Sequence, residues 1–412
     1  MLSALAIIAA FAVSDFGAVG DGVAKDTAAI QRAVDAAAAA GGGTVEFAPG
    51  TYLTGSVFLK DNVDFHVGPG VTLKASPDRT DYNAADVCPQ NWTSETESNS
   101  GAHLLLAIER RNVTVRGPGR IDGNSAKFLI GPNGERYRQS GIPWRPGQML
   151  YFVECENVRM TDIDLVNAPY WTCFLHGCEQ VAVRGVRIDV RRNPHTHNGD
   201  GIDIDSCRYV TVSDCRINSS DDAITLRGDW KRLKRRRPCE FVTVSNCILS
   251  SPCCGIRVGV GDGEVRNCVV SDCIIENTRT GIELVSAWTP GSHGVDIRAL
   301  RFANLRIEAG VFCRIRHQCA TEATVRDVEF SGISGTSELV SQIAANRPGC
   351  FSDIRFRDVR IDRGISIENA EGVVLEGGTF REVSLAEPEK AKWDEDFKRI
   401  SNRFWFREEG RW

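Results

Sequence analysis

One short unit recurs through the sequence after residue 150, and this repeat limits the fold more than any other feature. NVRMTDIDL (157–165), YVTVSDCRI (209–217) and FVTVSNCIL (241–249) are three copies. Successive copies centre on turn-forming residues 23 to 32 residues apart: Asp162, Gly185, Asp214, Asn246, Asp272, Asn304, Gly332 and Asp358. Such a period, with Val- and Ile-rich strands and no helical periodicity, is typical of stacked supersecondary units. The sequence therefore predicts an all-β fold, a right-handed parallel β-helix of about ten coils.

The fifteen cysteines follow the same repeat. Cys155, Cys178, Cys207 and Cys239 each stand three residues before the Val that opens a strand. Equivalent positions stack along a solenoid, and an unpaired cysteine behaves as a small, readily buried hydrophobic residue. We therefore expect interior ladders of thiols, with disulfide bonds as the alternative. The spacing matches neither a zinc site nor a small disulfide scaffold.

The two ends of the sequence differ from the repeats, because an open coil exposes its apolar interior and unpaired strand edges. Residues 1–13 are expected to be an apolar leader, and residues 14–412 a single β-helix domain, since no linker interrupts them. A helix is expected between Asp26 and the glycines near Gly41, where it would cap the first coil. Residues 387–412 are expected to form a helical or irregular tail that folds back as the other lid.

The leader and the overall charge bear on location and partners. The leader ends in Ala10-Phe11-Ala12 but lacks a positive start, so a secreted or periplasmic protein is expected, with a cytoplasmic one as the alternative. A net charge of −5 gives no general attraction to nucleic acid, and no apolar run after residue 13 is long enough for a membrane span. The repeats do not fix the assembly state, and a monomer is expected.

A basic run at residues 231–237 places six cations in seven residues, at the point where the repeat stretches to 32 residues. The extra length predicts a loop between two coils. Two interpretations of the loop stay open: it meets an acidic polysaccharide, or it is simply a solvated basic loop.

Six aspartates crowd into residues 198–228, although Asp is disfavoured in strands and costly to bury unpaired. Asp214 fills the turn position of the repeat, where an Asx side chain bonds to local backbone. Asp203 and Asp205 alternate with two isoleucines, so both are expected to face away from the interior. A hydrogen-bonded role and a substrate-facing role are both open for them.

Asp200 and the Asp221–Asp222 pair stand 21 residues apart, close to one coil, so the solenoid would place them side by side. Glycoside hydrolysis by inversion needs one carboxylic acid and one carboxylate that activates water. Crowding of like charges raises the pKa of one member and so keeps an acid protonated. A calcium site and a solvated acidic ridge are the alternative interpretations of the same three side chains.

These motifs resemble a known family. NGDGIDIDSC (198–207) followed by SSDDAITLRG (219–228) resembles the paired NTDG…D and GDDCIAIK signatures of glycoside hydrolase family 28, the polygalacturonases and rhamnogalacturonan hydrolases. Residues 15–76 also resemble the N-terminal cap and first coils of its bacterial members, a cap shared with other pectin-lyase-like folds. The resemblance implies hydrolysis of a pectin-like or related acidic polysaccharide or oligosaccharide. It implies no cofactor and no metal.

The resemblance also assigns roles to residues. It makes Asp221 the general acid, and it gives Asp200 and Asp222 the task of positioning and deprotonating the attacking water. Four further residues are expected to bind the substrate or line its site: Asn198, Arg227, His176 and Trp171. For the last two, core packing is the alternative.

Two motifs depart from the family pattern. PCCGIRVG (252–259) carries Cys254 where the family has a histidine, and a thiol cannot supply the cation of an imidazolium. RTGIELVS (279–286) carries Glu283 and Val285 at positions that are basic in the family. An acid there is expected to repel a uronate.

Other residues near the aspartates are candidates to replace these losses. Arg257 lies on a strand next to the Asp coil and is expected, with Cys254, to contact the substrate. His195 and His197 precede Asp200 and are interpreted as turn residues, with supply of the missing imidazole as the alternative. Two other functions stay open: a uronate polysaccharide lyase, which would use a basic residue and often calcium, and a β-helix that binds carbohydrate without cleaving it.

Overall fold

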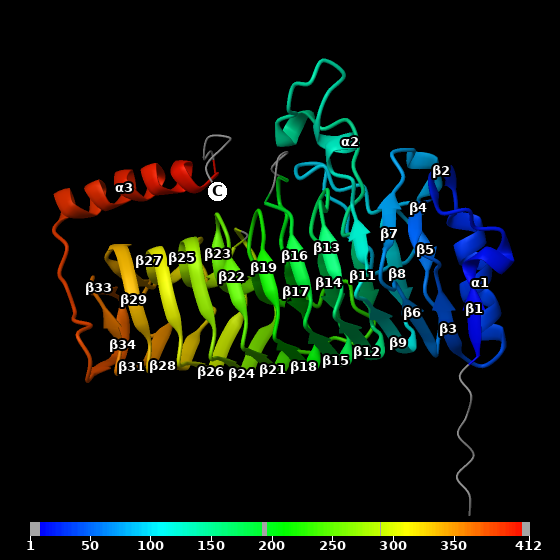
Figure 1. The fold of residues 1–412 in the computed structure, drawn as a ribbon. Helices are drawn as coiled ribbons and strands as arrows, with labels where there is room; N and C mark the ends of the chain where they lie inside the picture. The colour runs from blue at the N-terminus through cyan, green and yellow to red at the C-terminus, as the bar shows by residue number, and fades with distance from the viewer. Residues whose placement is uncertain (1–8, 192–195, 289, 406–412) are drawn as a thin grey trace, which may run out of the picture.

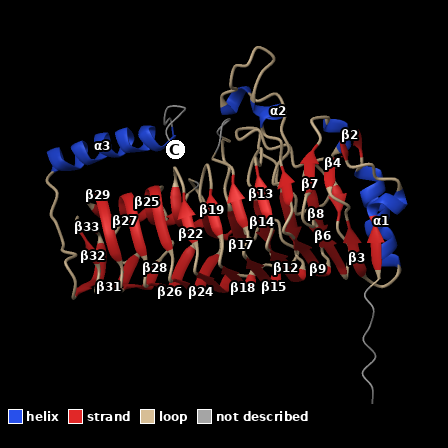
Figure 2. Ribbon diagram, in the orientation of Figure 1, coloured by secondary structure: helices blue, strands red, loops and turns tan. Residues whose placement is uncertain are grey.

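The computed structural model describes residues 9–191, 196–288 and 290–405. Within them the chain winds into a right-handed parallel β-helix, and all pairings between the named strands are parallel (Figure 1). Figure 2 shows that strands make up the body of the molecule and that the helices lie at its edges. The predicted fold class is therefore confirmed.

One face of the solenoid is a single sheet of thirteen strands. In spatial order they are β1 (Ala10–Ala12), β3 (Gly43–Glu46), β6 (Val63–His66), β9 (Arg111–Arg116), β12 (Glu156–Thr161), β15 (Glu179–Arg184), β18 (Arg208–Ser213), β21 (Cys239–Ser245), β24 (Glu264–Ser271), β26 (Asp296–Ala303), β28 (Val325–Ser331), β31 (Phe351–Arg357) and β34 (Ala370–Glu376). Each coil contributes one strand to this sheet, so the described residues form thirteen coils and not the expected ten. The difference arises because the early coils carry long loops that hide the repeat in the sequence.

The remaining twenty-one strands form the other two faces. The second face contains β2 (Asp21–Lys25), β4 (Gly50–Thr54), β7 (Val71–Ala75), β10 (Arg120–Asp122), β13 (Asp164–Val166), β16 (Arg187–Asp189), β19 (Arg216–Asn218), β22 (Ile248–Ser250), β29 (Ser334–Leu339) and β32 (Arg360–Ile361). The third face contains β5 (Val57–Phe58), β8 (Leu105–Ile108), β11 (Leu150–Val153), β14 (Cys173–His176), β17 (Ile202–Asp205), β20 (Ile224–Gly228), β23 (Cys254–Gly261), β30 (Ser341–Ala344) and β33 (Ile365–Glu368). Two long strands, β25 (Ile274–Ala287) and β27 (Arg306–His317), pair with both faces.

The predicted turn positions are also confirmed. All eight repeat centres have a left-handed backbone, with φ between +50° and +65°. Gly, Asn and Asp tolerate this conformation better than other residues do, which explains why they alternate at this position. The Asx side chains also bond from coil to coil, since Nδ2 of Asn246 donates to Oδ1 of Asp214 (3.4 Å).

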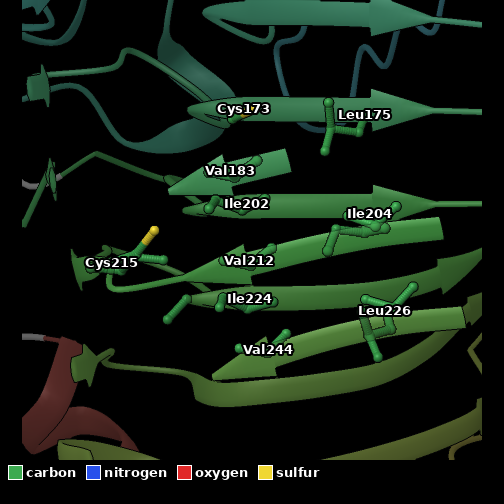
Figure 3. Packing of buried hydrophobic residues seen from close by; sticks show 14 of the residues in the cluster. Cys173, Leu175, Val183, Ile202, Ile204, Val212, Cys215, Ile224, Leu226 and Val244 are labelled. Carbon is green, nitrogen blue, oxygen red and sulfur yellow. The ribbon is translucent and has the colours of Figure 1, made fainter. Parts of the chain in front are cut away.

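The interior is one continuous hydrophobic core built from ladders of like residues. In Figure 3, Ile202 and Ile224 lie on neighbouring strands of the third face, as do Ile204 and Leu226. All fifteen cysteines lie in the described residues, fourteen of them are buried, and none forms a disulfide. The N–H of Cys178 donates to Sγ of Cys207 (3.2 Å), as expected for a ladder of stacked thiols.

The N-terminal end is covered by a helix, as the sequence predicts. Helix α1 (Thr27–Ala39) packs its Ala and Ile residues on the first coil. The carboxylate of its N-cap residue, Asp26, accepts from the N–H of Val19 rather than from the helix (2.7 Å). Of the residues expected in the leader, Ala10–Ala12 form β1 of the sheet and Val13 is fully buried in the core.

The C-terminal segment folds back, but not across the end of the solenoid. Helix α3 (Glu387–Trp405) lies along the flank, over β25 and β29, with its axis nearly parallel to the solenoid (Figure 1). Nε1 of Trp393 donates to the carbonyl of Val340 (2.8 Å). Gly310 allows close approach, because a Cβ there would lie 2.6 Å from Cγ2 of Ile400. On the last coils, the residue that packs on the core phenylalanines is not part of α3 but is Phe380, whose ring is buried.

Short helices complete the fold. They are α2 (Ala126–Leu129) and the 3-10 turns η1 (Val13–Phe16), η2 (Arg79–Asp81) and η3 (Gln139–Gly141). Helix α2 lies in a long excursion that projects from the solenoid (Figure 1). Among the described residues, no helix has the length and apolar character needed to cross a membrane.

Candidate active site

The candidate catalytic aspartates lie where strands of the third face begin. Asp200 precedes β17 and Asp222 precedes β20, and these two strands pair in register. The N–H of Gly201 donates to the carbonyl of Asp222 (2.9 Å), so the two turns are side by side. On the next coil, the N–H of Ala223 donates to the carbonyl of Cys254 (2.9 Å). One residue from each of three coils therefore forms an axial row.

Serine hydroxyls fix the turn that carries Asp221. Oγ of Ser219 and Oγ of Ser251 both donate to the carbonyl of Asp221 (2.6 and 2.5 Å). Oγ of Ser220 donates to the carbonyl of Thr196 on the preceding coil (2.6 Å). The serines of the SSDD motif thus have a structural role, and they hold the backbone from which the two carboxylates project.

The three carboxyl groups have unequal surroundings. Burial, with the charges of Asp203, Asp221 and Asp222, raises the pKa of Asp200 well above its usual value. Burial and the neighbouring Asp222 raise the pKa of Asp221 to about 7, although Arg257 opposes this shift. Asp222 forms a buried ion pair with Arg257, whose Nε donates to Oδ2 and whose Nη2 donates to Oδ1 (3.2 Å). An acid and a carboxylate therefore stand next to each other in the sequence.

Arg257 also belongs to a buried charge cluster that spans β23, β25 and β27. Its Nη1 lies 3.3 Å from Oε2 of Glu283, and Oε1 of Glu283 lies 3.3 Å from Nη1 of Arg314 and 2.8 Å from Nε of Arg316. Although burial opposes ionisation, these guanidiniums hold the pKa of Glu283 well below its usual range. These surroundings disfavour the expected repulsion of a uronate by Glu283, because guanidiniums outnumber the carboxylate. Val285 is fully buried.

Two adjacent thiols fill the space beside this cluster. Nη2 of Arg257 donates to Sγ of Cys253 (3.2 Å) and of Cys254 (3.3 Å), and Nη2 of Arg279 donates to Sγ of Cys253 (3.0 Å). Sγ of Cys254 donates to Oε2 of Glu283 (3.1 Å). Cys254 was expected to contact the substrate, but its side chain is fully buried and contacts the charge cluster instead.

In the described residues, the atoms best placed to hold a metal are an oxygen of Asp222 and the sulfurs of Cys253 and Cys254. They lie within 4.8 Å of one another. The guanidiniums of Arg257 and Arg279 donate to the same sulfurs, so a cation there would face two fixed positive charges. The surroundings of this donor set therefore disfavour a metal.

Asp203 and Asp205 are both buried, and they hold Arg227. Oδ2 of Asp205 lies 3.2 Å from Nε of Arg227, and Oδ1 of Asp203 lies 3.9 Å from Nη1. Burial raises the pKa of Asp203 to about 8, although Arg227 opposes the shift. The ring of Trp171 covers the guanidinium (4.7 Å from Cζ to the centroid). Arg227 thus keeps limited exposure, and Trp171 packs in a buried aromatic cluster.

His176 and Asn198 support the fold around the site. His176 is buried, its ring stacks on Phe174, and its Nε2 lies 2.9 Å from the carbonyl of Asp229, so the core-packing alternative holds. Oδ1 of Asn198 accepts from Nη2 of Arg145 (3.3 Å). Arg145 is fully buried and fixes the turn that leads to the first aspartate.

The histidines that precede Asp200 do not supply the missing imidazole where the structure describes them. Nε2 of His197 lies 3.3 Å from Nη2 of Arg136 and 3.3 Å from the carbonyl of Tyr137. Burial lowers the pKa of His197 to about 4, so the ring is neutral at neutral pH. His195 lies outside the described residues.

The basic run is a loop between β20 and β21, as predicted, but the fold uses most of its charge. Its ion pairs with acids of neighbouring coils are Lys231 with Asp262, Lys234 with Glu109, Arg235 with Glu154 and Arg237 with Glu179. Leu233 is buried in the aromatic cluster beside Trp171. These contacts anchor the loop and weaken the case for a polysaccharide contact there.

Sequence reasoning missed three members of the site: Arg279, Arg314 and Arg316. The signal was available in the register. Arg257, Glu283 and Arg314 occupy one ladder position on three successive strands, so aligning the coils by ladder position places opposite charges next to each other.

Comparison with known proteins agrees with this geometry. The family described as "Glycosyl hydrolases family 28" matches residues 87–377, and "Rhamnogalacturonase A/epimerase, pectate lyase-like" matches residues 10–126. A "Probable polygalacturonase" of Vitis vinifera is 24% identical to this chain. The match covers 69% of this chain and 58% of the length of that relative. One of Arabidopsis thaliana is 24% identical over 89% of this chain and 76% of its own.

A solved structure shares the fold over nearly the whole length. The exopolygalacturonase of Thermotoga maritima superposes with a TM-score of 0.69 at 22% sequence identity, covering 91% of this chain and 90% of that one. The family match covers most of the chain and includes every aspartate of the axial row and its neighbours. The chain therefore belongs to glycosyl hydrolases family 28.

Proposed function

We propose that this protein hydrolyses a glycosidic bond in an acidic, pectin-like polysaccharide or oligosaccharide, with inversion at the anomeric carbon. The observation that carries the proposal is the contrast between two adjacent carboxyl groups. The pKa of Asp221 is raised to about 7, whereas Asp222 is ion-paired with Arg257. Inverting glycosidases need one protonated and one ionised carboxyl group.

Each aspartate then has a defined task. Asp221 donates its proton to the glycosidic oxygen as the bond to the anomeric carbon breaks. Asp222 and Asp200 hold a water molecule on the opposite face of the sugar, and the ionised Asp222 takes up the proton of this water as the water oxygen bonds to that carbon. Loss of that proton and reprotonation of Asp221 restore the starting state.

An acidic substrate fits the charge of the neighbouring coils. Arg279, Arg314 and Arg316 are only partly buried, and together with Arg257 they outnumber Glu283 and Asp222. A carboxylate on the sugar would meet a surplus of guanidinium groups, which suit carboxylates geometrically. The names of the relatives support a polygalacturonate-like substrate. Because such polymers lie outside cells, we propose action in the periplasm or the medium.

The test is release of reducing ends from a panel of pectic and algal polysaccharides. We expect cleavage of an acidic member and loss of at least about a thousandfold in kcat for Asp221→Asn. Asp214→Asn is the matched control, because Asp214 is a repeat turn residue that lies between the two Asp motifs, and this variant should keep full activity. Proton NMR of the first product should show the inverted anomer.

Other outcomes would contradict the proposal. An unsaturated product that absorbs in the ultraviolet would favour a uronate lyase. Binding of a glycan that neither the parent protein nor Asp221→Asn cleaves would favour a carbohydrate-binding β-helix.

A further inference from the structure

A row of alternating charges crosses the site from one coil to the next. Asp222 pairs with Arg257, Arg257 with Glu283, and Glu283 with Arg314 and Arg316. Asp222, Arg257 and Glu283 are at most 6% exposed. Buried charges are costly unless each is paired, so a row of this kind needs a reason beyond stability.

We propose that Arg257 and Glu283 act as one positioning pair for catalysis, in which Arg257 holds Asp222 as the water-activating carboxylate and Glu283 cancels the positive charge that Arg257 and its neighbours place beside Asp221. The inference rests on the proposed function and adds two residues to it. Neither residue needs to touch the sugar.

The first half of the pair is a fixed cation on Asp222. Arg257 donates to both oxygens of Asp222 and to both thiols of the CC motif, so its guanidinium cannot rotate away. The ring of Trp288 covers it, with 5.1 Å between Cζ and the centroid. A guanidinium stays charged at every pH at which the enzyme would work, unlike an imidazole.

The second half is a counter-charge. Both Arg257 and Arg279 lower the pKa of Asp221 and so oppose the burial that keeps this acid protonated. Glu283 lies among the arginines, and its negative charge offsets part of theirs. Without Glu283, the general acid would lose its proton at a lower pH.

The charged and titratable groups that surround the aspartates come from several packed elements. Asp200 lies in the turn before β17, Asp203 and Asp205 on β17, and Arg227 on β20. Cys253 precedes β23, Cys254 and Arg257 lie on β23, and Arg279 lies on β25. Glu283 on β25 is surrounded by Arg257, Arg279, Arg314 and Arg316. Among these groups, Glu283 is the carboxylate that lies on the arginine side of Asp221.

The same pair explains both departures from the family pattern as one coupled change. Cys254 is small enough to leave room for the guanidinium of Arg257, which reaches its sulfur at 3.3 Å. Once an arginine occupies this space, an acid at position 283 balances it. A histidine at 254 and a base at 283 would leave Arg257 without room and without the counter-charge that Glu283 supplies.

The test is the pH dependence of kcat/KM in three variants. Arg257→Gln should move both limbs of the profile to higher pH, because it removes a positive charge from both aspartates. Glu283→Gln should move the alkaline limb to lower pH. Each shift should be about 1 pH unit or more, the size expected when one charge of a buried cluster is removed. The double variant Arg257→Gln/Glu283→Gln restores the net charge and should return the limbs toward those of the parent.

A matched control separates this effect from simple loss of a buried charge. Glu240 is also buried between two arginines, with Oε1 3.0 Å from Nε of Arg208 and Oε2 2.7 Å from Nε of Arg266, but it lies on the thirteen-stranded face. Glu240→Gln should lower the melting temperature and leave the pH profile unchanged. Arg257→Lys retains the charge and should fold if Arg257→Gln does not, with limbs close to those of the parent protein and kcat reduced on the order of tenfold.

The inference is overturned if Arg257→Gln and Glu283→Gln move the limbs in the same direction, or if Glu283→Gln shifts them no more than Glu240→Gln. Failure of the proposed function looks different, because Asp221→Asn would then cleave as fast as the parent, whatever the other variants do.

Discussion

Asp221 should impose an alkaline limit on activity near pH 7. Its pKa is raised to about 7, mainly by burial and further by Asp222. The protonated form is the one that can donate to the leaving oxygen, so activity should be highest below this pKa and fall about tenfold per pH unit above it. Roughly one molecule in eleven would still hold the proton at about pH 8, and roughly one in a hundred at about pH 9.

The assay is the initial rate of reducing-end release on the best substrate, measured as kcat/KM from about pH 5 to about pH 9.5. An aryl glycoside with a good leaving group, if the protein accepts one, serves as the control. Departure of such a leaving group needs little help from an acid, so the alkaline limb of the pH profile should flatten for the aryl glycoside. The reasoning is refuted if polysaccharide cleavage keeps rising at pH 9, or if both substrates lose activity in parallel.

Two further predictions concern the solenoid itself. Asp214 has φ +58°, so Asp214→Val should cost about 1 to 2 kcal/mol in the free energy of unfolding measured with urea, whereas Asp214→Asn should cost less than about 0.5 kcal/mol. Because none of the fifteen cysteines is in a disulfide, a reducing agent should leave the melting temperature unchanged. A thiol reagent should detect all fifteen thiols only after denaturation. A drop in melting temperature with reductant would contradict the described thiol ladders.

The repeat made much of this structure predictable. A coil of a parallel β-helix is one period of the sequence, so residues one period apart become axial neighbours without any knowledge of the loops. This is why Asp200 and Asp222 could be placed together from their spacing alone. The same logic located the turns at Asp214 and its equivalents, where a left-handed backbone restricts the residue type.

The pairing of charged side chains was harder to predict from the sequence. Glu283 was interpreted from its own charge, but its effect depends on Arg257, Arg314 and Arg316 from the neighbouring coils. The two interpretations of the basic run stayed open for the same reason, since its acidic partners, one aspartate and three glutamates, lie in four other segments of the chain. The placement of α3 depends on its close approach to Gly310, which the periodicity of the sequence does not predict.

Helix α3 ties the site to the order in which the chain is synthesised. The ring of Phe397 lies over the guanidiniums of Arg314 and Arg279, at 4.3 and 5.3 Å from Cζ to the centroid. Coils can stack as they leave the ribosome, because each contacts mainly its neighbours. A nascent chain that has reached residue 386 therefore already holds every aspartate of the site, yet the arginines beside them still lack their aromatic cover. Maturation of the site then waits for a helix encoded more than a hundred residues after Arg279.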